Sequence, residues 1–378
     1  MSRGLTFSRS EEMRAMLTLF LASVLTIGGV NAAPLQAGLS GESSANVKWL
    51  GDIPPDNSYC TRMLSFFGDR GTIVTEDAVL ASDDGGLKWK VEKRKGEVPQ
   101  SISDAWLASS NRLFILSGGA LFENSDRGSA WKPVDVGQKG IRYLAIAGGR
   151  TGKQLVLVGE RSVAITRARL AELPKYAQDS STSSPSMVVP AISISNDEGA
   201  SWRTVQLPEA IGYLDGVEMA GAYGVAWGPY AVYASTDGGL SWKLMNMDVP
   251  DEEEEAYPVS AAIASERLRV SLKNGRILAG SIAGRVLSTI ARSPAPLDHL
   301  TFINQCTGYG ITSEKTANTG QEDVLVKTED GGVTWNSVLH SERIVALSLG
   351  TVDLYGATSD HAFRVAVTTG QNTRTCLK

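Results

Sequence analysis

Six ionisable residues stand near the starts of predicted strands, where they could together recognise or transform a polar ligand. They are three arginines and three aspartates: Arg62, Arg142, Arg343, Asp104, Asp215 and Asp298. Guanidinium groups bind carboxylates through paired hydrogen bonds, and two carboxylates that face a sugar can hydrolyse a glycosidic bond. Four further polar residues occupy similar places: Tyr143, Tyr213, Tyr257 and His299. The pattern predicts either a polar ligand site or a set of salt bridges among these side chains.

The sequence predicts no catalytic set, no metal site and no cofactor. Three histidines are too few and too scattered for a histidine-based site, and no nucleophile-elbow motif occurs. The carboxylates from Asp251 to Glu255 are consecutive and lack the alternating spacing of calcium ligands, so we expect a solvated loop. A net charge of −5 without a basic patch excludes a nucleic-acid binder.

A second set of aspartates belongs to a repeated motif, Ser/Thr/Asn-x-Asp-x-Gly-x-x-Trp. Its five copies hold the pairs Asp84 and Trp89, Asp126 and Trp131, Asp197 and Trp202, Asp237 and Trp242, and Asp330 and Trp335. The hydroxyl and the carboxylate can hold a short turn closed, and glycine accepts the positive φ that the turn needs. The tryptophan starts the next strand and packs back under the turn. These aspartates are therefore predicted to be structural.

The spacing of the motif predicts the fold. Trp89 and Trp131 are 42 residues apart, and Trp202 and Trp242 are 40 apart. This is the period of a four-stranded propeller blade, ~40–45 residues. The 71 residues before Trp202 hold one period plus an insertion. The 93 residues before Trp335 hold two periods, with a decayed copy at Ala279 to Leu287. We predict an all-β protein with a single seven-bladed propeller, six blades being the alternative.

The two ends of the propeller complete one another. Three strands follow the last motif, at residues 344–349, 352–357 and 362–367, and they lack a fourth. Residues 46–50 supply it, since Trp49 lies 40 residues before Trp89. Closure in this way leaves only short, protected edges. It also suggests a disulfide between Cys60 and Cys376, with Cys306 as a buried thiol on a strand.

The repeated motif joins the third strand of a blade to the fourth and so lies on one face of the ring. The long polar insertions fall on the other face, at residues 167–189, 92–99, 251–258 and 313–323. The inner strands begin at that same face, so the ionisable residues named above would ring the mouth of a central channel. Loops on a rigid scaffold often carry binding sites. We therefore expect function on the face opposite the motif.

The N-terminus predicts export. Arg14 is followed by a mostly apolar run from Ala15 to Val30 and by a small-residue cleavage pattern ending at Ala33. We predict a signal peptide over residues 1–32 and a propeller domain over residues 33–378, with no membrane span after cleavage. The run is short for a spanning helix. The mature protein is expected to be a periplasmic or secreted monomer, and Met1 and Met13 both remain possible starts.

The five motif copies are those of the Asp-box, or BNR, repeat of the sialidase superfamily. In size, export signal and short blades the chain resembles propellers similar to the photosystem II stability and assembly factor. That resemblance implies protein binding during assembly of a membrane complex, without chemistry. This chain departs from the family's arginine-rich patch, since only Arg62, Arg142 and Arg343 are spaced around the rim. The photosystem role itself therefore does not carry over.

Enzymes with this repeat give the alternative interpretation. Sialidases use an arginine triad, which Arg62, Arg142 and Arg343 could imitate, but the chain lacks their Arg-Ile-Pro motif. Xyloglucanase-type glycosidases need two facing carboxylates, and Asp104, Asp215 or Asp298 could supply them. A carbohydrate-binding propeller without turnover is a third possibility. We predict a non-catalytic, protein-binding module of the cell envelope, with a glycan as the alternative ligand.

Overall fold

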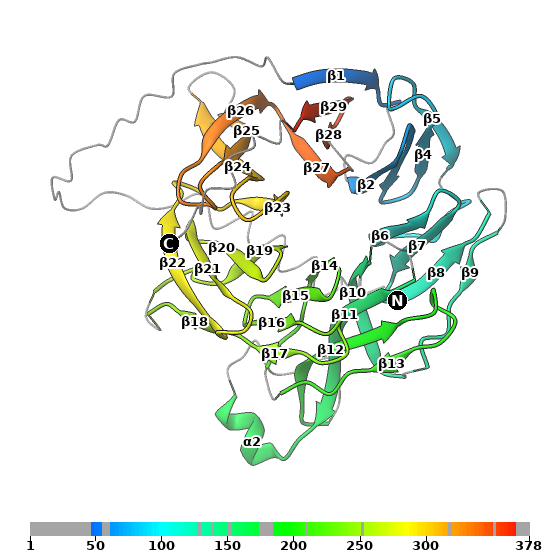
Figure 1. Ribbon diagram of the computed structural model, residues 1–378. Helices are drawn as coiled ribbons and strands as arrows, with labels where there is room; N and C mark the ends of the chain where they lie inside the picture. The colour runs from blue at the N-terminus through cyan, green and yellow to red at the C-terminus, as the bar shows by residue number, and fades with distance from the viewer. Residues whose placement is uncertain are drawn as a thin grey trace, which may run out of the picture. The chain divides into compact units, whose positions relative to one another are not determined.

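The computed structural model describes residues 47–54, 61–94, 96–126, 130–137, 139–149, 153–173, 184–208, 211–250, 253–316, 320–350 and 353–367. Seven sheets, antiparallel except for one added parallel strand, follow one another around a ring (Figure 1). The seven-bladed propeller predicted from the sequence is therefore confirmed. No helix within the described ranges is both long enough and apolar enough to cross a membrane.

The first four blades each contain four strands in chain order. Blade 1 holds β2 (Thr61–Phe67), β3 (Arg70–Thr75), β4 (Val79–Ser82) and β5 (Lys90–Lys93). Blade 2 holds β6 (Ile102–Ser109), β7 (Arg112–Ser117), β8 (Ala120–Asn124) and β9 (Lys132–Pro133). Blade 3 holds β10 (Ile141–Gly148), β11 (Leu155–Ala164), β12 (Ser186–Ser195) and β13 (Arg203–Thr204). Blade 4 holds β14 (Gly216–Ala220), β15 (Tyr223–Gly228), β16 (Ala231–Ser235) and β17 (Lys243–Leu244).

The remaining blades complete the ring. Blade 5 holds β19 (Pro258–Ala264), β20 (Arg267–Leu272), β21 (Arg276–Ser281) and β22 (Val286–Arg292), and β18 (Asn246–Asp248) adds a fifth strand parallel to β22. Blade 6 holds β23 (Asp298–Phe302), β24 (Gly308–Thr316), β25 (Gly320–Thr328) and β26 (Asn336–Ser341). Blade 7 holds β27 (Ile344–Leu349), β28 (Asp353–Thr358), β29 (His361–Ala366) and β1 (Val47–Asp52).

Blade 7 closes the ring as predicted. The N-terminal strand β1 pairs antiparallel with β29, and Val47 lies opposite Val365 (Figure 1). Blade 7 is also linked to blade 1, because the Gly51 N–H of β1 donates to the Gly86 carbonyl of blade 1 at 2.7 Å. A Cβ atom at Gly51 would lie 2.0 Å from the Leu87 oxygen, so only glycine permits this approach.

Apolar side chains fill the space between neighbouring blades. One core cluster joins Val158 and Ile194 of blade 3 to Ala226, Tyr233 and Trp242 of blade 4. Another joins Tyr309 and Ile311 of blade 6 to the closing blade. Strands that are buried on both sides read as nearly continuous apolar runs, such as Leu155 to Val158. Burial between blades therefore holds the ring together.

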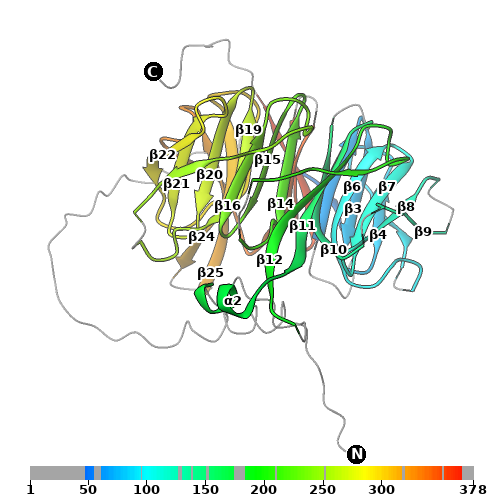
Figure 2. The ribbon, with the colours of Figure 1, turned by 90° about the horizontal axis from the view of Figure 1, so that it is seen from below.

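Two insertions differ from the loops expected. The segment after β11 contains a short helix, α2 (Arg167–Glu172), whose first turn is capped by the Thr166 side chain. Figure 2 shows α2 beyond the ends of β11 and β12. The stretch 313–323 is mostly strand, because β24 and β25 continue to Thr316 and from Gly320. Both features project on the face where the second and third strands connect.

Candidate functional site

Four of the repeated turns share one hydrogen-bond pattern. In the copy at 235–242, Ser235 Oγ accepts from the Gly239 N–H at 2.8 Å and donates to Asp237 at 2.9 Å. Asp237 also accepts from the Ser241 N–H at 2.9 Å. The same contacts recur around Asp84, Asp197 and Asp330. The turn at Asp126 lies partly outside the described residues.

Each of these turns is fastened to its surroundings. Within a blade, the residue after the aspartate donates its N–H to the turn between the first two strands, as Gly238 does to Ala222 at 2.8 Å. The preceding blade contributes a second contact, for example from the Arg203 guanidinium to the Leu240 carbonyl at 3.2 Å. The hydroxyl and carboxylate oxygens of the four described turns are thus engaged within the protein.

A buried arginine makes another of these links between blades. Arg269 is fully buried and has no carboxylate partner among the described residues. Its guanidinium donates to the carbonyls of Gly331 at 3.2 Å and of Gln305, and it lies 4.4 Å from the Phe302 ring centre. Burial lowers the pKa of Arg269 to about 10. Blade 5 has no copy of the motif, but its Arg269 donates a hydrogen bond to the motif turn of blade 6 at Gly331.

The predicted rim residues do lie at the starts of the inner strands. Arg62, Asp104 and Arg142 are within β2, β6 and β10, and Asp298 opens β23. Tyr213 with Asp215, Tyr257 and Arg343 come just before β14, β19 and β27. Six of the seven innermost strand pairs carry a register shift close to this end. Such bulges redirect side chains. At two of them the outcome differs: Tyr143 is buried and hydrogen-bonds Ser193 of its own blade, whereas Asp298 is exposed.

Several of these polar side chains join neighbouring blades. Asp104 accepts the backbone N–H of Ala105 and, from the next inner strand, that of Ile146, both at 2.8 Å. Glu218 accepts from Ile263 in the same manner. Three further acceptors repeat the arrangement with serine or aspartate: Ser260, Ser271 and Asp323. Asp104 was a candidate catalytic carboxylate in the sequence. Both of its carboxylate oxygens accept backbone hydrogen bonds, one of which comes from the neighbouring blade.

The environment of the mouth is concave. Asp215, Asp298 and His299 are solvent-exposed, yet surrounding protein desolvates them and shifts their pKa values towards the neutral form. Exposure combined with desolvation is expected of side chains on the wall of a channel. Burial raises the pKa of Asp104 to about 7, of Glu218 to about 8 and of Asp215 to about 6.

Tyrosines gather around Asp215. Burial, followed by the charges of Asp215, Tyr230, Glu160 and Tyr257, raises the pKa of Tyr213 to about 12, so these groups share one neighbourhood. The Tyr230 ring covers Gly212, where a Cβ atom would lie 2.5 Å from the ring. Tyr230 is nevertheless exposed. We call Tyr213, Asp215, Tyr230, Glu255 and Tyr257 the tyrosine mouth.

The three arginines do not form a triad. Arg62 approaches Glu76 at 3.9 Å, and Arg142 pairs with Glu160 at 3.2 Å. Arg343 is exposed just before β27. Two of the arginines therefore pair with glutamates outside the rim set, and no ion pair between a rim arginine and a rim aspartate occurs among the described residues.

The acidic run behaves differently from a solvated loop at one position. Glu253 forms salt bridges with Arg276 at 2.6 Å and with Arg292. The hydrogen bond from Arg276 is the main reason why the pKa of Glu253 is lowered. Residues 251 and 252 lie outside the described ranges. The run therefore anchors the segment that leads into β19.

The cysteine prediction needs a correction. Cys306 lies in the turn between β23 and β24, not on a strand, and it is disulfide-bonded. Its partner must be Cys60 or Cys376, because the chain has three cysteines. Both lie outside the described residues. The proposed pair of Cys60 with Cys376, leaving Cys306 as a free thiol, is therefore wrong.

Four functional or structural groups escaped the sequence reasoning: Glu160, Glu218, Tyr230 and Arg269. A weak signal existed for Glu218, which interrupts an apolar inner strand. Arg269 likewise interrupts the buried strand β20. A charged residue inside a strand that is buried on both sides requires a partner, but the sequence does not say which one.

The fold has known structural neighbours, whereas no family model and no curated protein matches the chain. YCF48 bound to D1 peptide has a TM-score of 0.57 and 16% identity, covering 86% of this chain and 99% of that one. YCF48 from Cyanidioschyzon merolae has a TM-score of 0.55 and 11% identity, covering 85% and 99%. An ancestral GH74 enzyme has a TM-score of 0.59 and 12% identity, covering 85% of this chain and 47% of the enzyme.

The chain thus spans about half the length of that GH74 enzyme. At identities this low, the similarity concerns the fold alone. The chain shares the propeller fold of both the YCF48 and the GH74 structures. The expected resemblance to the photosystem II assembly factor is confirmed at the level of the fold.

Proposed function

We propose that the protein is an exported, non-catalytic propeller that binds a protein partner during assembly of a cell-envelope complex. The observation that carries this proposal is the tyrosine mouth, which gathers aromatic rings and carboxylates on the face opposite the Asp-boxes. Tyrosine supplies a large contact area at low entropic cost and is enriched in protein interfaces. The surrounding blades provide a rigid support.

The partner segment should be basic. Asp215 and Glu255 bring negative charge beside the rings of Tyr213, Tyr230 and Tyr257. A lysine or arginine side chain would gain both ion pairing and a cation–π contact there. Binding should weaken as ionic strength rises, because exposed charges are screened.

The structural neighbours support a protein ligand in this fold. One of them is YCF48 solved with a D1 peptide, so a single propeller of this size has held a peptide. The acidic mouth of the present chain implies a partner of different charge from one that an arginine-rich patch would select.

Export and an oxidising compartment form part of the proposal. The apolar run before residue 33 supports a signal peptide, and the disulfide at Cys306 suits the periplasm or the exterior. Sequencing the N-terminus of the protein recovered from the envelope fraction tests this. A mature start near residue 33 supports export, and an intact leader in the cytoplasm contradicts it.

A glycoside hydrolase is the second candidate, because the fold also resembles a GH74 enzyme and carboxylates with raised pKa values line the channel. A general acid needs such a pKa. However, Asp104 and Glu218 already accept backbone hydrogen bonds from the next blade. This structural use favours binding over hydrolysis. A carbohydrate-binding role without turnover would use the same tyrosine rings.

The experiment compares capture of envelope proteins by the wild type and by an Asp215→Asn, Tyr230→Ala, Glu255→Gln variant. All three side chains are polar or exposed, so the variant should fold. The matched control replaces exposed apolar residues of the Asp-box turns, with Leu87→Ala, Leu240→Ala and Val333→Ala. We expect the mouth variant to lose a specific partner by at least about tenfold, while the control keeps it.

Equal capture by both variants would contradict the proposal. Turnover in a glycosidase screen that only the mouth variant loses would replace it with the hydrolase. Reversible binding of an oligosaccharide without turnover would replace it with the carbohydrate-binding role.

A further inference from the structure

The disulfide at Cys306 has two candidate partners, and the fold distinguishes them. Cys306 lies in the turn between β23 and β24 and is disulfide-bonded. The other cysteines are Cys60, before blade 1, and Cys376, after blade 7. Both lie outside the described residues, and the nearest described residues are Thr61 and Val367. The positions of these two residues limit what each cysteine can reach.

Cys306 lies on the Asp-box face of the ring. Its carbonyl accepts the N–H of Gly331, which belongs to the Asp-box turn of blade 6, at 2.8 Å. The equivalent contact in blade 1 joins the Gly85 N–H to the Asp69 carbonyl at 2.6 Å. Cys306 therefore corresponds in position to Asp69, in the turn that follows β2.

Thr61 is at the other end of β2 from that turn. It pairs with Thr75, the last residue of β3, whereas Phe67 at the end of β2 leads into the turn. The seven residues of β2 span about 20 Å. A disulfide joins Cα atoms about 4.4–6.8 Å apart, and one further residue adds ~3.8 Å. Cys60 is thus too far from the Asp-box face, and it adjoins blade 1, not blade 6.

Cys376 has a short route to the Asp-box face. Ala366, the last residue of β29, lies at the end of blade 7 where β27 connects to β28. Val367 packs against the core cluster between blades 6 and 7, as does Ile303 at the start of the disulfide-bonded turn. Cys376 follows Val367 by nine residues, which can extend over ~30 Å. The chain after Val367 is therefore long enough to reach the turn.

We infer that Cys306 is bonded to Cys376 and that Cys60 is the unpaired thiol. The bond encloses residues 306–376, which contain β24 to β29, and so ties the end of blade 7 to blade 6. A cross-link over so long a segment stabilises chiefly by restricting the unfolded chain. Blade 7 benefits most, because its fourth strand comes from the other end of the chain. The bond holds β27 to β29 against blade 6 independently of their pairing with β1.

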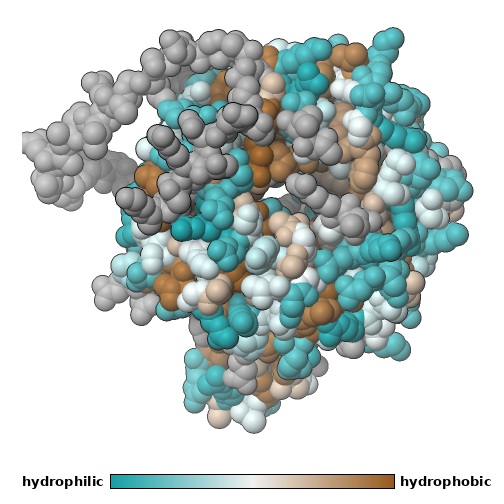
Figure 3. Space-filling view, in the orientation of Figure 1, coloured by the Kyte–Doolittle hydropathy of each residue, from teal (hydrophilic) through white to brown (hydrophobic). Residues whose placement is uncertain are grey.

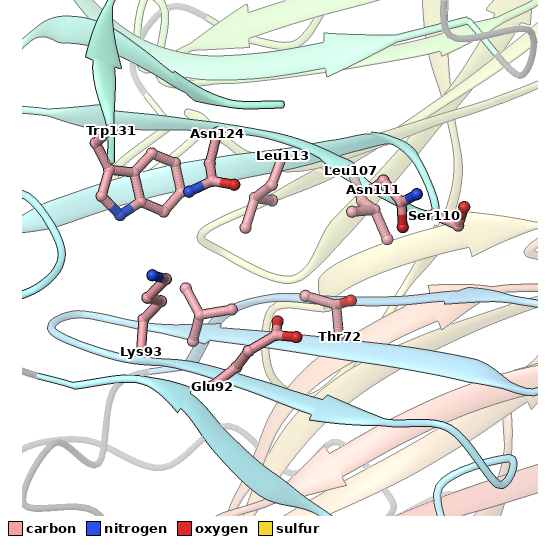
Figure 4. Close-up of a pocket in the computed structure, with 10 residues that line it drawn as sticks. Thr72, Glu92, Lys93, Leu107, Ser110, Asn111, Leu113, Asn124 and Trp131 are labelled. Atoms are coloured by element: carbon pink, nitrogen blue, oxygen red, sulfur yellow. The ribbon is translucent and has the colours of Figure 1, made fainter. Parts of the chain in front are cut away.

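No second joint between blades can be strengthened by a disulfide within the chain, since it has three cysteines. Between blades 1 and 2 the contacts are noncovalent: Thr72 and Lys93 of blade 1 face Leu113 and Trp131 of blade 2 (Figure 4). Reduction should therefore affect blades 6 and 7 and leave blades 1 and 2 as they are. The inference does not rest on partner binding at the tyrosine mouth.

Peptide mapping of the full chain distinguishes the two pairings directly. Free thiols are first blocked with iodoacetamide in denaturant, and the protein is then digested with trypsin without reductant. Trypsin releases Cys306 in residues 293–315, Cys376 in residues 375–378 and Cys60 in residues 49–62. We expect the first two peptides to be joined and the third to be alkylated. A peptide 293–315 that is joined to 49–62, or that is unlinked, would overturn the inference.

Hydrogen exchange tests what the bond does for blade 7. Dithiothreitol reduces the bond to two thiols and is itself oxidised to a cyclic disulfide. In the reduced protein we expect amides of β28 and β29 to exchange at least about tenfold faster, while those of β7 and β8 in blade 2 are unchanged. Cys376→Ser should reproduce this effect without reductant, and Cys60→Ser is the matched control that should not. Equal exchange of β28 and β29 in the oxidised and reduced wild type would show that the bond does not secure blade 7.

Discussion

Aspartates on the two faces of this propeller have opposite electrostatic character. In the Asp-box turns, hydrogen bonds dominate: the Ser201 hydroxyl and N–H, with Ser195, lower the pKa of Asp197 to about 2. At the channel, burial dominates and raises the pKa of Asp104 to about 7. The Asp-box face, which is turned towards the viewer in Figure 3, mixes hydrophilic and hydrophobic residues and is hollowed near its centre.

The comparison shows why one residue type serves two purposes. A carboxylate that accepts several donors in a turn remains charged and fixes the backbone. A carboxylate that a channel wall desolvates lies close to its charge transition and responds to whatever approaches. The Asp-box carboxylates are fully engaged by hydrogen bonds within their turns. Asp215, on the channel wall, is exposed and can contact a ligand.

The largest effect is expected from removing an Asp-box tryptophan. Trp242→Ala should lower the free energy of unfolding by about 3–5 kcal/mol, because the ring is buried between blades 3 and 4 and packs under its own turn. Urea denaturation measures the change. Trp49→Ala is the matched control, since Trp49 is 47% exposed and should cost much less. Equal losses would show that burial under the turn is not what matters.

The next effect concerns the link from blade 5 to the Asp-box of blade 6. Arg269→Met keeps much of the volume but leaves the Gly331 and Gln305 carbonyls without their donor. We expect a loss of about 1.5–3 kcal/mol in the free energy of unfolding. The change Arg267→Met, at a half-buried position of the same strand, serves as control. An unchanged unfolding midpoint for Arg269→Met would contradict the role assigned to this side chain.

A smaller effect is expected from pH. The folded protein binds more protons than the unfolded chain between the ordinary pKa of Asp104 and its raised value of about 7. The free energy of unfolding should therefore fall as pH rises from 6 to 8. Asp104→Asn should remove roughly 1.4 kcal/mol of that fall, measured by denaturation at each pH. A steeper fall in this variant would reverse the assignment.

The Asp-box aspartates predict the opposite trend at low pH. Their pKa values are lowered in the folded state, so their contribution is present above the ordinary aspartate pKa and is lost as pH falls towards 2. Together with the channel groups, this places the pH of greatest stability on the acidic side of neutrality.

The smallest effect on stability should come from the tyrosine mouth. Asp215→Asn at pH 7 should not lower the free energy of unfolding, because burial already disfavours the charged carboxylate, while it weakens partner capture. Denaturation and capture are measured on the same preparation. A large loss of stability would mean that Asp215 belongs with Asp104 among the structural carboxylates.

The fold was largely predictable because its signal is local and repeated. The spacing of Trp89, Trp131 and Trp242 gives the blade period, and the orphan strand around Trp49 gives the closure. The sequence also placed Arg62, Asp104 and Asp298 at the correct ends of the inner strands. It could not give their partners, because these lie on other strands. Glu76 and Glu160 are in the same blades as Arg62 and Arg142, whereas the Ile146 N–H reaches Asp104 from the neighbouring blade.

The details that failed have physical reasons as well. Cys306 looked like a strand residue because apolar residues precede it, but the turn at 303–307 interrupts the sheet. Glu253 looked solvated because its neighbours are acidic, yet two arginines from β21 and β22 reach it. A local turn thus decided the first case, and contacts distant in sequence decided the second.

The pairing of β1 with β29 also determines the order in which parts of the ring can form. A chain made from its N-terminus exposes its first strand long before the partner of that strand exists, since Val47 pairs with Val365. Contacts so distant in sequence form late. Until then the first and sixth blades each leave a flank open, and a destabilised seventh blade would give an open arc prone to joining a second copy. Shortening the chain at either end would thus act on the last step of folding, not on the blades already made.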